Sequence, residues 1–256
     1  MWVKIKKYQV QVIGMAVIVI LMMITISFSE RNLDNHICQD IVIRVDNQHG
    51  NFFIDEQDVM DLITASGEYV IKGTPYEDLN LKEIEGRIKT ERFIKEAEIY
   101  KDLKGNLLVN IKLRRPFARV VREDAPNAFI AEDGAVLPYS AKFATRTVLL
   151  SGDYMDELVK TDLTETEEGQ KIYDLLKYIQ RDRFWKAQVA QLDIAEDGEI
   201  IIYPQVTKQL VEFGQAENID SKFERLKIFY KQILPRKGWN LYKRVNLKYK
   251  DQIIAE

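Results

Sequence analysis

The longest apolar stretch of the sequence lies near its N-terminus. No charged residue occurs between Tyr8 and Ser29, and the core of this stretch is Val10 to Phe28. Nineteen helical residues at about 1.5 Å each extend about 28 Å, close to the thickness of a membrane's hydrocarbon layer. A buried soluble helix would normally carry a polar stripe over so many turns. A cleaved signal peptide, with Ser27-Phe28-Ser29 as its cleavage site, would have a shorter apolar region. The pattern favours an uncleaved transmembrane helix.

The charges on either side of this segment predict its orientation. Lys4, Lys6 and Lys7 precede it, whereas Arg31 is the one cation that follows closely. Cations are retained on the cytoplasmic side of a membrane. We therefore expect residues 1–9 to form a cytoplasmic tail, and residues 29–39 to form a polar tether to the rest of the chain outside the membrane.

After the tether, the apolar pattern predicts a strand, two helices and two further strands. Ile41, Ile43 and Val45 alternate along one strand face. Helix starts with capping residues follow at Asp55 and Asn80. The remaining strands are expected at 94–101 and 107–113, joined by a turn at 104–106. Pro116 cannot donate a backbone hydrogen bond, so it should end or bend the last strand. Residues 40–118 thus form a βααββ domain.

Residues 119–256 have the pattern of a mostly antiparallel β-rich domain with two helices. Apolar spacing predicts the helices at 167–181 and 223–233. Strands are expected at 129–131, 135–138, 147–150, 189–194, 199–203, 209–213, 241–249 and 252–255. Together with the N-terminal helix and the first domain, this pattern predicts an α+β protein.

Composition excludes several kinds of function. Apolar residues make up 46% and charged residues 30% of the chain, as in globular proteins. The net charge of −3 includes three cations before the apolar segment, so the body of the chain is more acidic still. An acidic body is unsuited to nucleic-acid binding, which depends on neutralising phosphates.

We find no residues arranged for catalysis, metal binding or cofactor binding. His36 and Cys38 lie in the tether, and His49 is the only other residue of either kind. Glu132 and Asp133 are adjacent to a glycine, which favours a turn over a pair of glycosidase carboxylates. The sequence has neither a Gly-x-Ser-x-Gly motif nor a phosphate-binding P-loop. We therefore expect a protein without enzymatic activity and without a small-molecule substrate.

Basic residues gather near the C-terminus. They are Arg236, Lys237, Lys243, Arg244, Lys248 and Lys250. These cations either complement an acidic partner or form a solvent-exposed face. The second interpretation is favoured, because the cations alternate with the core candidates Leu241, Val245 and Leu247. Trp239 and Tyr242 beside them either anchor a partner or cover the end of the sheet.

The order of these segments resembles the FtsQ/DivIB family of bacterial cell-division proteins, and the βααββ domain looks like a POTRA domain. Arg114, Pro116 and Ala118 stand where that family closes its POTRA domain. The family commonly has an acidic residue three positions before the proline, where this chain has Leu113. Residues 129–138, FIAEDGAVLP, resemble the opening of the family's β-domain. The resemblance extends to Gly214, the helix after it and the strand at 245–249.

This resemblance implies a scaffold protein of the divisome, anchored by one helix in the bacterial inner membrane at the septum. Its periplasmic domains would recruit and link other division proteins, and its C-terminal strand edge would accept a strand from an FtsB-type partner that is itself paired with an FtsL-type protein. Open strand edges suit this role because their backbone groups are unpaired. The expected contact residues are Val245, Leu247, Tyr249, Asp251, Gln252, Ile253 and Ile254. The alternative interpretation of Ile253 and Ile254 is that they complete the core of the sheet.

Two other functions are compatible with parts of the pattern. A POTRA-bearing binding module of an outer-membrane assembly or secretion system would usually carry several POTRA domains or a barrel, and this sequence has one such unit and no barrel-like strands. An anchored envelope hydrolase would need convergent polar residues, which the sequence does not offer.

Overall fold

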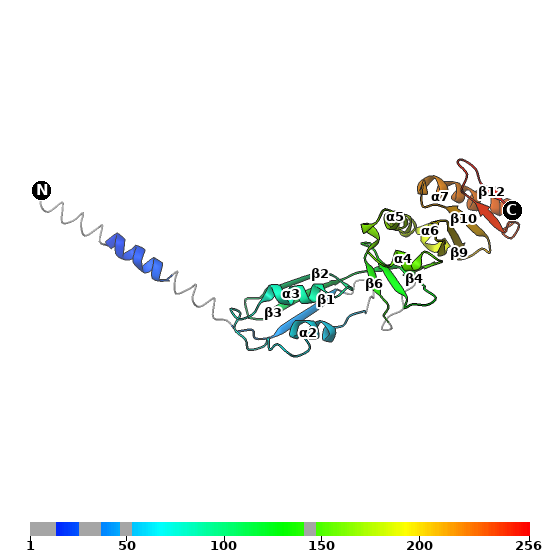
Figure 1. Ribbon diagram of the computed structural model, residues 1–256. Helices are drawn as coiled ribbons and strands as arrows, with labels where there is room; N and C mark the ends of the chain where they lie inside the picture. Colours follow the sequence, from blue (N-terminus) through cyan, green and yellow to red (C-terminus); the bar gives the residue numbers. More distant parts are fainter. Residues whose placement is uncertain (1–13, 26–36, 47–52, 141–146) are drawn as a thin grey trace, which may run out of the picture. The chain divides into compact units, whose positions relative to one another are not determined.

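A computed structural model describes residues 14–25, 37–46, 53–140 and 147–256 of the chain (Figure 1). The chain divides into two compact units. The first consists of Met1–Asp46, Asp55–Thr90 and Glu96–Ile111, and the second of Asn47–Ile54, Glu91–Lys95 and Lys112–Glu256.

The predicted βααββ order is confirmed. Its elements are β1 (Ile41–Asp46), α2 (Glu56–Thr64), α3 (Leu81–Lys89), β2 (Ile94–Lys101) and β3 (Leu107–Leu113). Over the described residues these strands form a sheet in the order β1-β3-β2. Val59 and Ile63 of α2 and Ile84 and Ile88 of α3 are buried. One apolar face of each helix therefore packs into the core of this unit.

Both helices begin at the capping residues that the sequence predicts. The Asp55 side chain accepts a hydrogen bond of 2.9 Å from the Asp58 N–H, and the Asp58 side chain accepts one of 2.9 Å from the Asp55 N–H. The Asn80 side chain accepts from the Glu83 N–H at 3.2 Å. These bonds satisfy backbone donors that the first turn of a helix leaves free.

The second unit contains the remaining elements. Its strands are β4 (Pro116–Val120), β5 (Ala128–Ala131), β6 (Val136–Pro138), β7 (Val148–Ser151), β8 (Val189–Ile194), β9 (Ile200–Pro204), β10 (Leu210–Gly214), β11 (Arg244–Asn246) and β12 (Ile254–Ala255). Its helices are α4 (Met155–Leu158), α5 (Glu167–Arg181), α6 (Arg183–Gln188), α7 (Ile219–Ile228) and α8 (Leu234–Lys237), with a 3-10 turn η1 (Leu163–Glu165) and a π-helix η2 (Phe229–Ile233).

These strands form a mixed sheet. Among the described residues its order is β12-β11-β10-β9-β8-β7-β4-β5-β6. Pairing is parallel between β4 and β7, between β7 and β8, and between β10 and β11, and antiparallel between the other neighbours. Most neighbouring pairs of the described sheet are antiparallel, as the sequence predicts, but the sequence did not reveal the three parallel pairs. The α+β class itself is confirmed.

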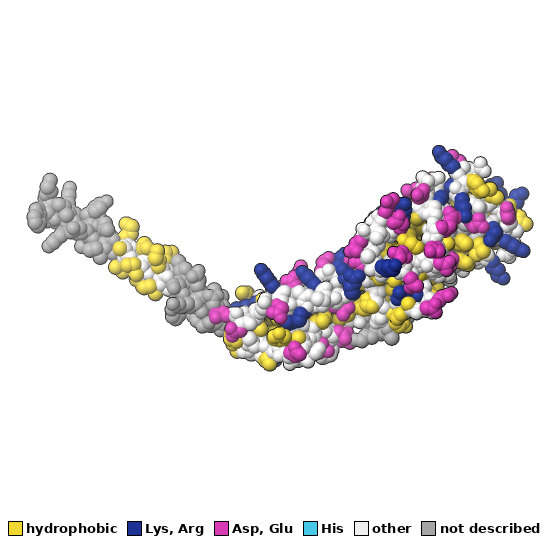
Figure 2. All heavy atoms as spheres, in the orientation of Figure 1, with side chains coloured by type: hydrophobic (Ala, Val, Ile, Leu, Met, Phe, Trp, Pro, Cys, Tyr) yellow, Lys and Arg dark blue, Asp and Glu magenta, His cyan; other side chains and the backbone are white. Residues whose placement is uncertain are grey.

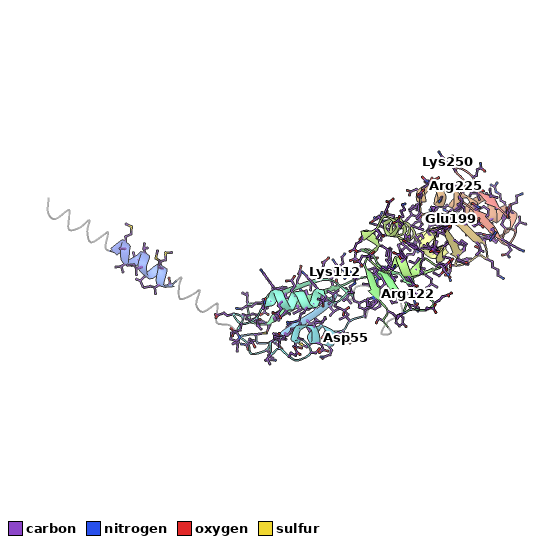
Figure 3. The ribbon with its side chains drawn as sticks, in the orientation of Figure 1. Asp55, Lys112, Arg122, Glu199, Arg225 and Lys250 are labelled. Carbon is purple, nitrogen blue, oxygen red and sulfur yellow. The ribbon has the colours of Figure 1, made fainter. Side chains whose placement is uncertain are left out.

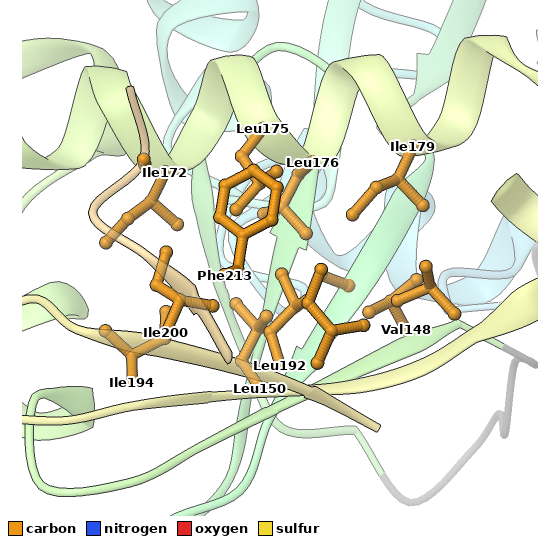
Figure 4. Close-up of a cluster of buried hydrophobic side chains, with 14 of the residues drawn as sticks. Val148, Leu150, Ile172, Leu175, Leu176, Ile179, Leu192, Ile194, Ile200 and Phe213 are labelled. Carbon is orange, nitrogen blue, oxygen red and sulfur yellow. The ribbon is translucent and has the colours of Figure 1, made fainter. Parts of the chain in front are cut away.

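The core of this unit lies between α5 and the sheet (Figure 4). Leu175, Leu176 and Ile179 of α5 are fully buried. Figure 4 shows them above side chains from several strands, among them Leu150, Leu192, Ile200 and Phe213. The bounds of α5 and β8 are those that the apolar spacing predicts, because both elements bury one clearly patterned face.

Other elements of this unit differ from the sequence prediction. Pro116 begins β4 instead of ending the preceding strand, and the register of β4 against β5 shifts between Pro116 and Ala118. The missing N–H of Pro116 is compatible with the first position of a strand. The structure adds α6 and several short helical turns, so the expectation of two helices was too low. The strand expected at 241–249 is shorter, because the chain pairs with β10 only around Val245.

Part of the apolar N-terminal segment lies outside the described residues. Residues 14–25 are helical, and their side chains are exposed. Of the helices that the structure describes, none has both the length and the apolar content needed to cross a membrane. The prediction for Val10 to Phe28 as a whole cannot be compared with the structure, since residues 10–13 and 26–28 lie outside the described part.

Candidate functional site

The C-terminal residues form one end of the large sheet. β12 pairs antiparallel with β11, with Ala255 opposite Val245 and Ile254 opposite Asn246. No described strand lies beyond β12 (Figure 1). The open edge at this end of the sheet is therefore the outer side of Ile254–Ala255.

The hydrogen-bond register shows which backbone groups of β12 face outward. The Arg244 N–H donates to the Glu256 carbonyl oxygen, and the Glu256 N–H donates to the Arg244 carbonyl oxygen, both at 3.0 Å. In antiparallel pairs, residues that exchange two such bonds alternate with residues that exchange none. Ala255 is the next residue along, so its N–H and carbonyl oxygen point away from β11. An added strand would bond to Ala255.

Val245 and Leu247 do not lie on this edge, contrary to the sequence prediction. β11 has β10 on one side and β12 on the other, so Val245 is paired with both Val211 and Ala255. The side chains of Val245 and Leu247 are fully buried in the core. Their apolar character is explained by packing, because β11 is enclosed between β10 and β12 and only β12 lies at the edge.

The other predicted contact residues lie at or near the surface. Ile254 is 39% exposed and Tyr249 is 55% exposed. Asp251 occupies the turn between β11 and β12 with φ of 57°, and Gln252 after it is exposed. Ile253 is half-buried and packs against the core. Ile253 thus contributes to the core, whereas Ile254 presents an apolar side chain to solvent.

Arg225 of α7 holds this terminal hairpin in place. Its guanidinium Nη1 donates to the carbonyl oxygens of Tyr249 at 2.5 Å and Gln252 at 2.6 Å, and Nη2 donates to that of Leu247 at 3.3 Å. Figure 3 shows Arg225 beside Lys250 at the C-terminal end. Charge-assisted hydrogen bonds are stronger than neutral ones, so one side chain constrains both arms of the hairpin.

Two acidic residues, one on β10 and one just before β9, bind polar side chains of β11 and of the segment that follows it. The Asn246 side chain donates to the Glu212 carboxylate at 2.8 Å, and Arg244 lies 3.5 Å from the same carboxylate. Lys248 pairs with Glu199, and this hydrogen bond raises the pKa of the Lys248 amine. Arg244 and Lys248 therefore have acidic partners within the chain.

The remaining members of the basic cluster do not have such partners. Among the described residues, no ion pair involves Arg236, Lys237, Lys243 or Lys250. The sequence from Arg225 to Lys250 contains no acidic residue at all. Figure 2 shows Lys and Arg side chains gathered around the C-terminal end. The end of the chain that carries β12 thus combines these cations with the exposed acids Asp251 and Glu256, on a chain that is acidic overall.

Aromatic and apolar side chains lie beside these cations. Trp239 is about half exposed and stacks on Tyr230 at a centroid distance of 6.4 Å. Tyr242 packs against the buried Phe229 at 5.6 Å. Leu241, which the sequence analysis assigned to the core, is 58% exposed. Tyr242 thus covers the core, whereas Trp239 and Leu241 offer apolar surface.

The opposite edge of the sheet is blocked. Val136 of β6 donates its N–H to the Asp162 carboxylate at 2.9 Å. Pro138, two residues later on the same strand, has no N–H to offer. A carboxylate on an edge N–H and a proline are devices that prevent strand addition. Of the two ends of the described sheet, β12 is the one that offers an outward N–H group, at Ala255, whereas the outward N–H positions of β6 are bonded at Val136 and missing at Pro138.

The residues of the predicted domain closure have structural roles. Arg114 Nε lies 3.0 Å from the Asp133 carboxylate, and its Nη1 donates to the carbonyl oxygens of Arg92 at 2.7 Å and Ile94 at 2.8 Å. Ala118 is fully buried in β4. Asp133 thus forms an ion pair with Arg114 from a distant turn. The sequence does not predict this pairing, because only the fold brings the two residues together.

Comparison with known families gives two matches. Residues 36–112 match a POTRA-like domain. Residues 115–256, more than half of the chain, match the family described as FtsQ/DivIB, C-terminal related. The chain belongs to the FtsQ/DivIB family. A comparison with curated proteins finds no significant match.

Membership confirms the resemblance drawn from the sequence. FtsQ/DivIB proteins act in cell division through protein–protein interactions, and their domains are generally not enzymes. Among the described residues, no group of three or more His, Cys, Asp and Glu side chains is placed to hold a metal ion. His36 of the tether lies outside the described residues.

Proposed function

We propose that this FtsQ/DivIB protein is a non-enzymatic divisome scaffold that captures an FtsB-type partner, itself paired with an FtsL-type protein, by adding the partner's strand to β12. The observation that carries the proposal is the open outer side of Ile254–Ala255 at the end of the large sheet. Backbone hydrogen bonds at a sheet edge supply affinity, and alternate side chains supply specificity.

The contrast between the two ends of the sheet supports this site. β6 is closed by Asp162 and Pro138, whereas Ala255 of β12 directs its N–H and carbonyl oxygen outward. Arg225 restrains the hairpin that carries β12. A restrained edge loses less conformational freedom when a partner binds, which favours affinity.

The side chains around β12 define the partner's chemistry. Ile254 and Tyr249 offer apolar contacts. Lys243 lies just before β11, and Lys250 lies in the turn before β12. A partner strand with apolar residues and an acidic flank would complement both features. The carboxylates of such a flank would also make binding weaker at high salt.

We further propose that residues 10–28 anchor the protein in the inner membrane, with residues 1–9 in the cytoplasm and the rest in the periplasm at the septum. The helical residues 14–25 are uncharged, and their apolar side chains are exposed all round. A helix of this kind is suited to a lipid surrounding. The other proposed parts are the tether at 29–39, the POTRA-like domain at 40–118 and the β-domain at 119–256.

Substitution of Ala255 by proline tests the strand-addition site. Ala255→Pro removes an N–H that points outward, so the pairing of β12 with β11 should survive. We expect the full-length variant to remain folded but to lose co-purification with the FtsB-type partner from membranes. Ala255→Ser keeps the N–H and is the matched control. Undiminished capture by a folded Ala255→Pro variant would refute the proposed docking mode.

A cellular experiment tests the division role separately. We expect cells depleted of the protein to form filaments, because septation requires the assembled division proteins. Cells expressing only the Ala255→Pro variant should filament as well. Normal cell length after depletion would contradict the proposed function whatever the fate of the strand-addition site.

A further inference from the structure

Three apolar side chains are exposed in the first unit close to the point where the tether enters it. Ile37 is 43% exposed, Val70 is 75% exposed and Leu103 is fully exposed. Leu103 lies in the turn between β2 and β3, where polar residues or glycine are usual. Neither the described core nor the edge at β12 makes use of these three residues.

Backbone hydrogen bonds place the loop containing Val70 beside the entry point. The Cys38 N–H donates to the Thr74 carbonyl oxygen at 2.9 Å, and the Gly73 N–H donates to the Cys38 carbonyl oxygen at 2.8 Å. The Thr74 hydroxyl donates to the Val70 carbonyl oxygen at 2.7 Å. Ile37 forms a bridge with Pro75 of the same loop.

The turn containing Leu103 is attached to the same point. The Gln39 N–H donates to the Gly105 carbonyl oxygen at 2.8 Å. The Asp102 carboxylate accepts hydrogen bonds of 2.8 Å from the N–H groups of Asn106 and Lys104, and the bond from Asn106 is the main cause of the lowered pKa of Asp102. The turn is therefore well ordered, and its shape holds the Leu103 side chain in solvent. Figure 1 shows the β2–β3 turn at the end of the first unit that the chain enters.

The length of the tether limits how far this end of the unit can lie from the membrane. The anchor proposed above ends at Phe28, and nine residue steps separate Phe28 from Ile37. Even a fully extended chain advances at most about 3.6 Å per residue, so these steps span about 32 Å. If the anchor lies in the membrane, the loops bonded to Cys38 and Gln39 are thus confined to within about 32 Å of its surface.

We propose that this end of the POTRA-like domain docks on the outer surface of the bilayer, with Leu103 and Val70 inserted among the lipid headgroups. Apolar side chains at the membrane interface bind in proportion to the apolar area they bury. The charges of the same loops are compatible with this contact: Lys104 is exposed, and the Lys72 amine lies 3.2 Å from the Asp40 carboxylate. The inference rests on the proposed anchor, because without it nothing holds these loops close to lipid.

Quenching by lipid-attached spin labels tests this contact on the full-length protein. A cysteine introduced as Leu103→Cys carries an environment-sensitive fluorophore, and the protein is reconstituted in phosphatidylcholine vesicles that contain headgroup-labelled lipid. Cys38 is fully buried and should not react with the dye in the folded protein. The matched control is Val206→Cys, which labels a residue of the second unit that is 71% exposed.

We expect the label at position 103 to lose most of its fluorescence to the spin-labelled lipid, while the label at position 206 retains it. Val70→Asp in the Leu103→Cys protein should restore part of the lost fluorescence, because a carboxylate opposes insertion. Equal quenching at positions 103 and 206 would refute the contact. A shift of the emission at position 103 without quenching by lipid would show that protein covers the residue instead, and would also refute it.

Flotation of the same vesicles separates this inference from the proposed anchor. Protein that floats with the vesicles but shows no quenching at position 103 retains the anchor and refutes the lipid contact. Protein that fails to float refutes the anchor, and with it the contact that depends on the anchor.

Discussion

The Arg225 guanidinium donates a hydrogen bond of 2.6 Å to the carbonyl oxygen of Gln252, which joins α7 to the residues just before β12. The same side chain reaches Tyr249 on the other side of the turn. The edge proposed to receive a partner strand is therefore restrained from within its own unit. The position of this edge depends on Arg225, which precedes β12 by more than twenty residues in the sequence.

Replacing Arg225 by methionine should loosen the terminal hairpin while keeping an apolar stem on α7. A hydrogen bond to a charged group contributes about 1.5–3 kcal/mol to stability, and this contribution is lost when the charged donor is removed. We expect faster amide hydrogen exchange at residues 244–256 and weaker capture of the FtsB-type partner. Exchange within α5 should be unchanged, and equal exchange in wild type and variant would contradict the role assigned to Arg225.

Substituting Gly152 by alanine should destabilise the second unit. Gly152 has a φ of 106°, and a Cβ atom at this position would overlap the backbone of Ile194. Left-handed backbone strain and overpacking together should cost more than about 2 kcal/mol. Urea denaturation followed by intrinsic fluorescence measures the loss, since Trp185 lies in the core of the same unit.

The opposite result is expected at Gly86, which serves as a contrast to Gly152. Gly86 lies in the interior of α3, and a Cβ atom there would meet nothing within 4 Å. Alanine is favoured over glycine in a helix by about 1 kcal/mol, chiefly because glycine loses more backbone freedom. Gly86→Ala should therefore raise the melting temperature of the first unit. A lower melting temperature would show that this position has a role beyond the helix.

The ion pair between Asp182 and Lys227 should make stability depend on pH. The Lys227 amine lies 3.0 Å from the Asp182 carboxylate and, with the Phe184 and Trp185 N–H groups, lowers the pKa of Asp182. A carboxyl group whose pKa falls on folding stabilises the protein above its unfolded pKa of about 3.9. That stabilisation is lost as the pH drops through the lower, folded pKa.

Asp182→Asn tests this dependence because the amide oxygen can still cap α6. At pH 7 the variant should be less stable than wild type, by less than about 1 kcal/mol because the pair is partly exposed to solvent. The difference should shrink as the pH falls below the unfolded pKa. Thermal denaturation of both proteins across this range measures it, and a difference that stays constant with pH would contradict the assignment.

The sequence alone determined the elements with strong local signals. Asp55 and Asn80 mark the starts of two helices because their side chains bond to nearby backbone groups. The bounds of α5 follow from apolar residues at helical spacing, and those of β8 from a short apolar strand pattern. The order of segments also sufficed to indicate the FtsQ/DivIB family, which the match over residues 115–256 confirms.

Only the tertiary structure decided which strands are neighbours and which edges are open. Val245 and Ile254 are both apolar residues near the C-terminus, and no local pattern tells that the first is enclosed between two strands while the second lies on an edge. Likewise, Asp162, which accepts the outward N–H of β6, and Asp133, which pairs with Arg114, both come from distant turns. A strand's periodicity specifies which face is buried, but its partners depend on how remote segments pack, and this determines which backbone groups remain free to bind.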